Sequence, residues 1–548
     1  MKKFEIMTLS KSILLNGTAI VFFAAILVFT GCDGRRPSGS PEGRTGGAGS
    51  STGATVLQSW ASNTVPLQIV ARVHWRGTKD FNSVGIPAAL LSIWELPETE
   101  ELKNRAIRRI AGALAAELSN DPNDATNWVR IHRMVNDVLV HENYFQMGKG
   151  EDAWPYCAWA IRMDRERWIT WKTNFADMLE PLHHDGQTVG VIGKLLVQMD
   201  YSNGWGVLGF SPQVNPLFQA FMSRFRSQSS SPYVWSTNYW LEIDTDVTHW
   251  PTAIKPPTAV QIPRIGVSIV AEGEELRVDA ELNFATRLAL SVSEWQVPTQ
   301  LIDGSLSSFT AIRGLTNLLD RGSAWQRVTA ERPPEQLFAW ALRGLQMQTY
   351  MAAPLPDASN VVSRITEKVL SLEDPWGGTN ELVGFQRSSQ FQGFEWRGLP
   401  YLWPFLKTAE ANGRAYMYAG TFPMGDVYPI AASTLDVLNP TNLLYYDWEM
   451  TSVRAEQWLY IGQFARLVTQ KAQLPLDSTS VCWLKAAAPK LRNSLTLGTI
   501  TGPSQLSFVR KSTLGLTGVE LQLLCDWLES PAFPRGFHTM LAAPEPLK

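Results

Sequence analysis

The sequence predicts an α+β protein made of two diverged tandem repeats, each a mostly antiparallel or mixed sheet packed with helices. Three observations support this prediction. Segments with the two-residue alternation of strands are joined by short turns and interleaved with segments of helical spacing. Short sequence matches recur in the same order in residues 56–292 and 293–548. The body of the chain is also too long for one ordinary domain.

The two predicted repeats share three short matches, each of them weak by itself. Their order along the chain is preserved, which chance similarity seldom achieves. The matched pairs are AWAIR (158–162) with AWALR (339–343), TNYWLEIDTDVTHW (237–250) with TNLLYYDWEMTSVRAEQW (441–458), and LQIVARVHWRG (67–77) with SSFTAIRGLTN (307–317).

In the first repeat, residues 84–141 predict an extra helical region. WPYCAWAIRM (154–163) alternates like a strand, whereas RERWITWKTNFADMLEPL (165–182) has helical spacing. Apolar segments on either side of Ser202-Asn203-Gly204 predict a hairpin, because Asn and Gly tolerate the positive φ of a tight turn. NPLFQAFMSRFR (215–226) returns to helical spacing.

In the second repeat, LFAWALRG (337–344) and QTYMAAPL (348–355) predict strands. A helix follows over residues 357–370, and the side chain of Asp357 or Ser359 is expected to accept hydrogen bonds from its first N–H groups. The boundary between the repeats is placed near Val297-Pro298, where a linker and an ordinary loop look alike.

Residues 1–31 have the pattern of a bacterial export signal. Lys2, Lys3 and Lys11 precede an uncharged apolar run that ends at Phe29-Thr30-Gly31-Cys32. We expect Cys32 to receive lipid after cleavage. Because the apolar run is long enough to cross a bilayer, an uncleaved signal anchor is the main alternative, and an ordinary secretory signal is a third.

The leading alternatives place the chain on the extracytoplasmic side of a bacterial membrane, in the cell envelope or periplasm, with the lipid bilayer as a partner. Residues 32–55 are rich in Gly, Ser and Pro and predict a disordered tether. Asp33 resembles an inner-membrane retention signal, but the choice between inner and outer membrane stays open.

The composition excludes nucleic acid as an expected partner. The formal net charge is only −3, and no basic stripe is visible. The chain is rich in tryptophan, with 22 residues of this type spread along it. This even spread favours thick aromatic cores. The alternative is a carbohydrate-binding protein, which requires several exposed, coplanar tryptophans.

Cysteine usage does not predict a disulfide framework. After Cys32 only Cys157, Cys482 and Cys525 remain. Cys482 and Cys525 each fall on the apolar face of a predicted helix, so we expect buried free thiols. Whether these two pair stays open.

The candidates for catalysis are two acidic strand ends. Asp244-Thr245-Asp246-Val247-Thr248 follows an apolar strand, as in the D-x-D-x-T motif of haloacid-dehalogenase-type phosphotransferases. Asp447 and Glu449 occupy the matching place in the second repeat. In the structural alternative, alternate carboxylates face solvent and the threonine begins the next helix.

Other patterns carry less chemistry. Gly204-Trp205-Gly206-Val207-Leu208-Gly209 matches a dinucleotide fingerprint, but Trp205 and Val207 are expected in the second strand of a hairpin rather than before a helix. His183-His184-Asp185 and His249 are expected to be solvated, and His74 and His132 to be ordinary, partly buried residues. No metal or cofactor is predicted.

Several segments of the second half resemble a family of uncharacterised bacterial envelope proteins with duplicated α+β halves. The resemblance implies an exported protein and transfers no catalytic residues. The segments are SFTAIRG (308–314), TYMAAPLPDASNVVSRITEKVL (349–370), NLLYYDWEM (442–450), EQWLYIGQ (456–463), QLSFVRKSTLGLTGVELQLL (505–524) and DWLESPAFPRGFHT (526–539).

These observations predict a non-enzymatic, membrane-anchored lipoprotein that binds or scaffolds an unknown envelope protein or glycan. The rival is an envelope hydrolase of glycans or phosphate esters, with Asp244/Asp246 or Asp447/Glu449 at its centre. Convergence of those carboxylates in a pocket favours the hydrolase, whereas their use in the fold favours the binding protein.

Overall fold

The computed structural model describes residues 67–79, 85–118, 125–150, 154–179, 188–192, 195–227, 239–250, 263–288, 290, 292–314, 316, 324–329, 331–344, 347–371, 384–397, 402–422, 437–438, 440–468 and 475–534. These residues form two compact units. Unit 1 holds residues 86–103 and those from 271 onward, and unit 2 holds the described residues up to 85 and 104–270. The chain passes from unit 2 to unit 1 after residue 270, whereas the predicted boundary between the repeats was 292/293.

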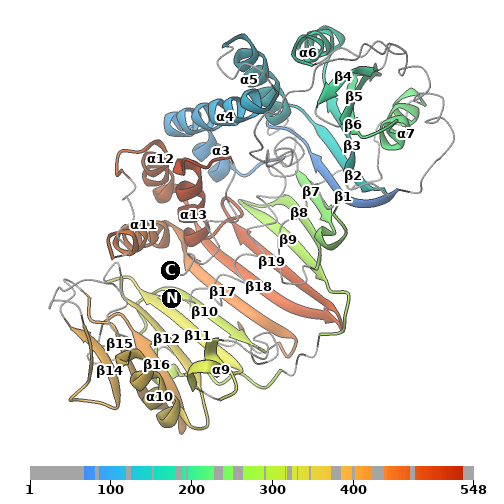
Figure 1. Ribbon diagram of the computed structural model, residues 1–548. Helices are drawn as coiled ribbons and strands as arrows, with labels where there is room; N and C mark the ends of the chain where they lie inside the picture. The colour runs from blue at the N-terminus through green and yellow to red at the C-terminus, as the bar shows by residue number, and fades with distance from the viewer. Residues whose placement is uncertain are drawn as a thin grey trace, which may run out of the picture. The chain divides into compact units, whose positions relative to one another are not determined.

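Unit 2 contains an antiparallel ladder in the order β4–β5–β6–β3–β2–β1–β7–β8. Strands β1, β2 and β3, the first three along the chain, form a meander, and β7 returns to pair with β1 (Figure 1). The strands are β1 (Gln68–Trp75), β2 (Asn143–Lys149), β3 (Pro155–Arg162), β4 (Thr188–Ile192), β5 (Leu195–Ser202), β6 (Trp205–Ser211), β7 (Leu241–Thr245) and β8 (Arg264–Glu272).

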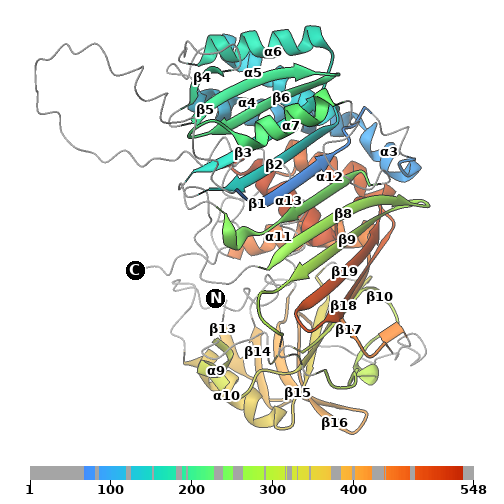
Figure 2. The same cartoon turned by 90° about the vertical axis from the view of Figure 1, so that its right-hand side faces the viewer.

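Helices cover both faces of the centre of this ladder. A Cβ at Gly206 would meet the ring of Trp168 on α6 (Arg165–Met178), and a Cβ at Gly209 would meet Phe218 on α7 (Pro216–Arg226). These glycines lie three residues apart on β6, so they face opposite sides. Figure 2 shows α7 over the strands. The predicted helical region is present as α3 (Ala88–Trp94), α4 (Pro97–Leu118) and α5 (Ala125–Val140). The prediction placed all of it in the first repeat, whereas α3 and the part of α4 up to Lys103 belong to unit 1.

The predicted hairpin between β5 and β6 is confirmed. Ser202 lies opposite Trp205, and the two residues between them have positive φ, 49° at Asn203 and 85° at Gly204. Two successive residues of positive φ match the twist of the flanking strands. The glycine-rich segment 204–209 is therefore strand β6, and the dinucleotide alternative is excluded.

Asn215 holds the start of α7 in the core of unit 2, so its replacement is expected to be costly. Its Oδ1 accepts from the N–H groups of Leu217 and Phe218, and its Nδ2 donates to the carbonyl of Cys157 at 2.6 Å. We expect Asn215→Ala to lower the free energy of unfolding of unit 2 by about 2 kcal/mol, because a cap is lost together with a buried hydrogen bond to a backbone carbonyl. Chemical denaturation measures this loss.

Asp357, which accepts from the N–H of Asn360 at the exposed start of α10 (Ala358–Leu370), provides the control. The sequence left Asp357 and Ser359 as alternatives for this cap, and the structure has Asp357. Asp357→Ala removes a cap at an exposed site and no buried hydrogen bond, and we expect a loss of about 1 kcal/mol. Equal losses for the two variants would contradict the burial argument for Asn215.

Unit 1 contains a second antiparallel ladder, in the order β13–β14–β15–β16–β12–β11–β10–β17–β18–β19–β9. Its strands are β9 (Glu275–Asn283), β10 (Leu306–Arg313), β11 (Gln336–Leu342), β12 (Thr349–Pro354), β13 (Gly384–Arg387), β14 (Gly393–Arg397), β15 (Phe405–Ala411), β16 (Arg414–Gly420), β17 (Leu443–Met450), β18 (Asn493–Gly502) and β19 (Gln505–Ser512). The prediction of an α+β fold with antiparallel strand pairing is confirmed.

The two ladders follow one connection rule. Each has a three-stranded meander, β1–β2–β3 or, after β9, β10–β11–β12. The third strand of that meander pairs with the last strand of a second meander. A later strand then returns to the first strand of that meander, β7 to β1 and β17 to β10. A helix follows the third strand in both, α6 after β3 and α10 after β12.

Two of the three sequence matches join strands with equivalent places in these ladders. The match 67–77 with 307–317 pairs β1 with β10, and the match 237–250 with 441–458 pairs β7 with β17. The AWAIR match instead joins β3 to β11, whereas β11 has the ladder place of β2. Apolar alternation is common to buried strands, so this short match carried little positional information.

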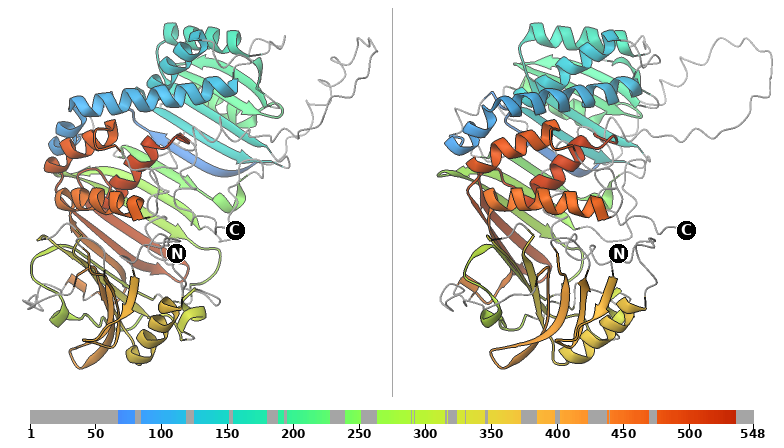
Figure 3. Two further views of the ribbon diagram at one scale, coloured as in Figure 1. Left: turned by 60° about the vertical axis from the view of Figure 1, so that its left-hand side comes forward. Right: turned by 90° about the vertical axis from the view of Figure 1, so that its left-hand side faces the viewer.

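In unit 1 the helices α11 (Thr451–Val468), α12 (Thr479–Ala487) and α13 (Gly518–Glu529) cluster together, and α11 lies against β10, β17 and β18. They are the orange and red helices of Figure 3. The short helix α9 (Ala324–Thr329) packs on α10, which covers β15 and β16. The register from β17 to β16 puts α10 and α11 on the same face of the ladder.

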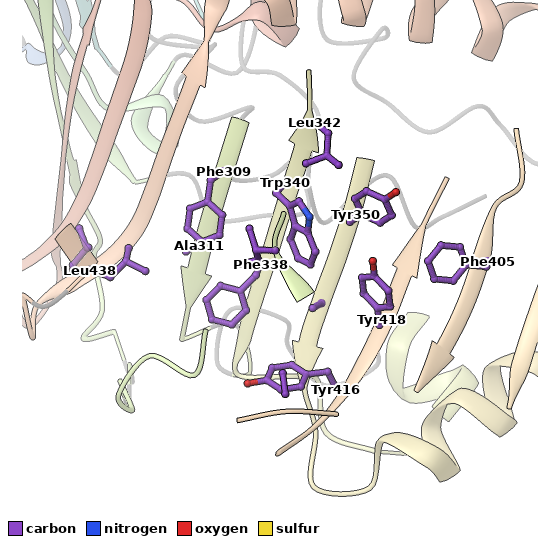
Figure 4. Close-up of a cluster of buried hydrophobic side chains, with 14 residues drawn as sticks. Phe309, Ala311, Phe338, Trp340, Leu342, Tyr350, Phe405, Tyr416, Tyr418 and Leu438 are labelled. Carbon is purple, nitrogen blue, oxygen red and sulfur yellow. The ribbon is translucent and has the colours of Figure 1, made fainter. Parts of the chain in front are cut away.

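The opposite face of this ladder carries an aromatic core. The rings of Trp340, Tyr350 and Tyr418 stand on neighbouring strands, with centroids 5.8–6.0 Å apart and planes within 29° of parallel (Figure 4). All three are buried. Trp340 therefore serves core packing, the role that the sequence predicted for the tryptophans.

Candidate functional site

The predicted carboxylates Asp244 and Asp246 lie in unit 2, at the end of β7. Asp244 forms a two-point ion pair with Arg264 on β8, at 2.7 Å and 2.5 Å. Asp246 contacts His249 Nδ1 at 2.7 Å, and its backbone N–H donates to Val70 O on β1. Both side chains are partly exposed. Their contacts join β7 to its neighbours and to the following turn.

The other predicted carboxylates, Asp447 and Glu449, lie in unit 1 on β17 and are buried. Asp447 Oδ1 accepts from the hydroxyl of Thr310 at 2.5 Å. Glu449 Oε1 accepts from the backbone N–H of Gly518 at 2.6 Å, so it receives the first N–H of α13. Thr451 begins α11, as predicted. The expectation that these alternate carboxylates face solvent is wrong, because α11 and α13 cover this face.

The two acidic strand ends are not equivalent. On β7 the buried alternate residues are Leu241, Ile243 and Thr245, and Asp244 points to the other face. On β17 the buried alternate residues include Asp447 and Glu449. One residue of shift moves a side chain to the opposite face of a strand. The acidic residues of the two strands therefore occupy different environments, and each unit holds its own pair.

Asp447 and Glu449 belong to a buried polar layer between β10, β17, β18 and β19 and the helices above them. Thr310, Asp447, Thr496 and Arg510 form one cross-strand row. Sheets that pack on helices usually bury apolar residues at such positions. The polar layer is composed of the buried residues Asp447, Glu449, Thr496 and Arg510 from the strands and Arg454, Gln457 and Glu520 from the helices, together with the half-buried Thr310.

The strongest contact in the polar layer is the ion pair of Arg510 and Glu520, at 2.6 Å and 3.2 Å. Arg510 also donates to the Thr496 hydroxyl and the Gly515 carbonyl. Burial by itself lowers the pKa of the Arg510 guanidinium, but attraction to Glu520 outweighs it and holds that pKa above its ordinary value. Arg510 thus stays charged and needs its partner.

The rest of the polar layer is less completely paired. Burial lowers the pKa of Arg454, although Glu449 and Asp447 attract its charge. Arg454 donates to Gln457 Oε1 at 2.7 Å. Among the described residues, neither Arg454 Nε nor Asp447 Oδ2 has a hydrogen-bond partner. Burial also raises the pKa of Tyr445 well above its ordinary value. A buried unpaired carboxylate oxygen is the one feature here that favours a functional role for Asp447.

A second titratable cluster lies in unit 2 and was missed from the sequence, which predicted an ordinary role for His74. The His74 ring is 3% exposed. Its Nε2 lies 3.1 Å from Glu142 Oε1, and its Nδ1 lies 3.4 Å from Glu242 Oε2. The ring stacks on Tyr144 at 4.2 Å between centroids. Only the strand pairing brings residues so far apart in sequence together, so no local motif could have revealed them.

The tryptophans and cysteines of the described residues serve packing. Trp403 is 36% exposed and is the one tryptophan among the exposed large apolar residues there. Cys157, Cys482 and Cys525 are free thiols, as expected, so Cys482 and Cys525 do not pair. Burial raises the pKa of Cys157 and Cys525 above the ordinary thiol range.

The described parts of the chain contain no helix that is both long and apolar enough for a membrane span. The same parts hold no group of three or more His, Cys, Asp or Glu side chains arranged for a metal ion. Cys32, the tether and His183-His184-Asp185 lie outside the described residues. Comparison with protein-family models, with curated proteins and with solved structures found no match.

Proposed function

We propose that the chain is an exported, membrane-anchored lipoprotein, built from two diverged copies of one α+β module, that binds or scaffolds another component of the cell envelope. The observation that carries the non-enzymatic role is the use of the four predicted carboxylates. Asp244, Asp246 and Glu449 make contacts that join strands, turns and helices, and the two pairs belong to different units.

Duplication is supported by the ladders and by sequence order. In both units the third strand of the first meander pairs with the last strand of a second meander, and a later strand returns to the first meander. The second meander has three strands in unit 2 and four in unit 1. Two of the three sequence matches join strands with equivalent places. A common connection rule with weak residual similarity is what an old internal duplication leaves behind.

Anchoring is supported by the basic start, the apolar run and Gly31-Cys32 in the sequence. We expect Cys32→Ala to abolish incorporation of labelled fatty acid in cells, because the acylated thiol is removed. Cys482→Ala, which removes another thiol of the chain, is the matched control and should label like the parent. Labelling that persists in Cys32→Ala would rule out this lipid site, and membrane retention without any label would favour the uncleaved anchor.

The binding role is tested by crosslinking the anchored protein in intact cells and comparing it with Cys32→Ala. A partner of the scaffold should be recovered with the anchored form and lost with the variant that is not held at the membrane. Turnover of envelope glycans or phosphate esters by the purified chain, abolished by Asp447→Asn but not by Asp200→Asn, would instead establish the hydrolase. Asp447 is the residue tested because its Oδ2 is buried and has no hydrogen-bond partner among the residues that the structure describes.

A further inference from the structure

The cluster around His74 connects three parts of unit 2 that are distant in the sequence. His74 lies on β1, Glu142 lies immediately before β2, and Glu242 lies on β7. His74 is directly opposite Tyr144 in the β1–β2 pairing and opposite Glu242 in the β1–β7 pairing. One imidazole therefore contacts both neighbours of β1, at the point where the returning strand joins the meander.

The contacts require a protonated ring. An imidazole donates from both nitrogens only as the cation, whereas the neutral ring donates from one and accepts at the other. Both nitrogens of His74 face carboxylate oxygens, which only accept. The neutral ring would therefore turn a lone pair toward one carboxylate, and burial makes that arrangement costly.

The two carboxylates are not held equally. Glu142 also accepts from the Tyr144 hydroxyl at 3.1 Å and from Arg162 Nη1 at 3.2 Å. Glu242 lies farther from the ring than Glu142 does, at 3.4 Å against 3.1 Å. When the ring loses a proton, the shorter and better supported contact with Glu142 is retained. The contact with Glu242 is then lost.

We propose that His74 is a proton-operated latch that ties β7 to β1 when protonated and releases β7 when neutral. This device does not depend on the membrane anchor. It makes one strand junction of unit 2 respond to the pH of the surroundings, in the range where histidine titrates.

The direction of the response follows from the charges. Burial lowers the pKa of His74, but hydrogen bonds to Glu142 and Glu242 outweigh it and raise that pKa above 6.5. Burial raises the pKa of Glu142, but the contact with His74 outweighs it and takes that pKa below 4.5. The histidine contribution is full below pH 6.5 and is lost as the pH rises through the higher folded value. The Glu142 contribution is present above pH 4.5 and is lost as the pH falls through the lower folded value.

Two backbone amides report the latch. The N–H of Asp246 donates to Val70 O at 2.8 Å, and the N–H of Arg76 donates to Trp240 O at 3.1 Å. These bonds close the two ends of the β1–β7 pairing. Hydrogen exchange of the full chain, corrected for intrinsic rate, should show protection at both amides falling about tenfold or more between about pH 6 and pH 8. NMR titration of the ring should give a pKa above 6.5.

Three variants separate the latch from general effects of pH. Glu242→Gln removes the carboxylate whose contact with His74 depends on protonation, while His74 itself is unchanged. Protection of the two amides should then no longer change with pH. His74→Gln should give low protection that is independent of pH. His249→Gln changes a 48%-exposed histidine paired with Asp246 and should leave the pH response intact. A His74 pKa at or below 6.5, or unchanged protection in the parent, would overturn the proposal.

Discussion

Replacement of Arg510 by Met is expected to lower the free energy of unfolding of unit 1 by about 3–5 kcal/mol, the usual cost of removing one partner from a buried ion pair. Glu520 is 1% exposed and would lose the cation that pairs with it in the buried layer. The Thr496 hydroxyl and the Gly515 carbonyl would also lose their donor. Thermal unfolding measures the loss, and hydrogen exchange at β18 and β19 assigns it to unit 1.

The control is the exposed ion pair of Arg492 with Glu274 in the same unit. Arg492→Met is expected to cost between about 0 and 1 kcal/mol, since exposed pairs are solvated and screened by salt. The double variant Arg510→Met with Glu520→Gln should recover part of the loss, because the unpaired charge is gone. An Arg510→Met variant as stable as Arg492→Met would show that the polar layer does not depend on this pair.

Local chemistry was sufficient to predict many elements of the fold. The Asn203-Gly204 turn, the Asp357 cap and the strand at 154–163 depend on neighbouring residues alone, and each is present. The order of strands in each ladder could not be predicted, because β7 pairs with β1 across 168 residues at His74 and Glu242. Pairings at such separation depend on the whole core, which a single sequence does not display.

The environment of the candidate residues was beyond sequence reasoning for the same physical reason. Asp244 and Asp447 look alike in the chain, each at the end of an apolar strand. Cover by α11 and α13 buries Asp447, whereas Asp244 stays partly exposed beside Arg264. Strand alternation predicts that residues two apart lie on the same face of the sheet. Which face is buried depends on where the helices pack, and alternation does not give this.

Replacement of Glu449 by Ala is expected to lower the free energy of unfolding of unit 1 by about 3 kcal/mol. Its carboxylate accepts the N–H of Gly518 at 2.6 Å in a buried site, and hydrogen bonds to charged groups contribute about 1.5–3 kcal/mol. The variant would leave that N–H without an acceptor at the start of α13. It would also remove a negative charge that attracts Arg454. Chemical denaturation, followed by hydrogen exchange at α13, measures the effect.

Asp244→Ala is the matched control, since it removes the corresponding candidate from a partly exposed ion pair. We expect it to cost at most about 1 kcal/mol. The comparison decides between the two uses of these carboxylates. Residues kept for catalysis commonly cost stability, so replacing them leaves the fold equally or more stable while activity is lost. If Glu449→Ala were as stable as the parent chain, Glu449 would not be a structural residue of α13. That result would favour the hydrolase hypothesis, with Asp447 and Glu449 as its candidate carboxylates. A loss of the expected size would instead show that Glu449 stabilises the fold.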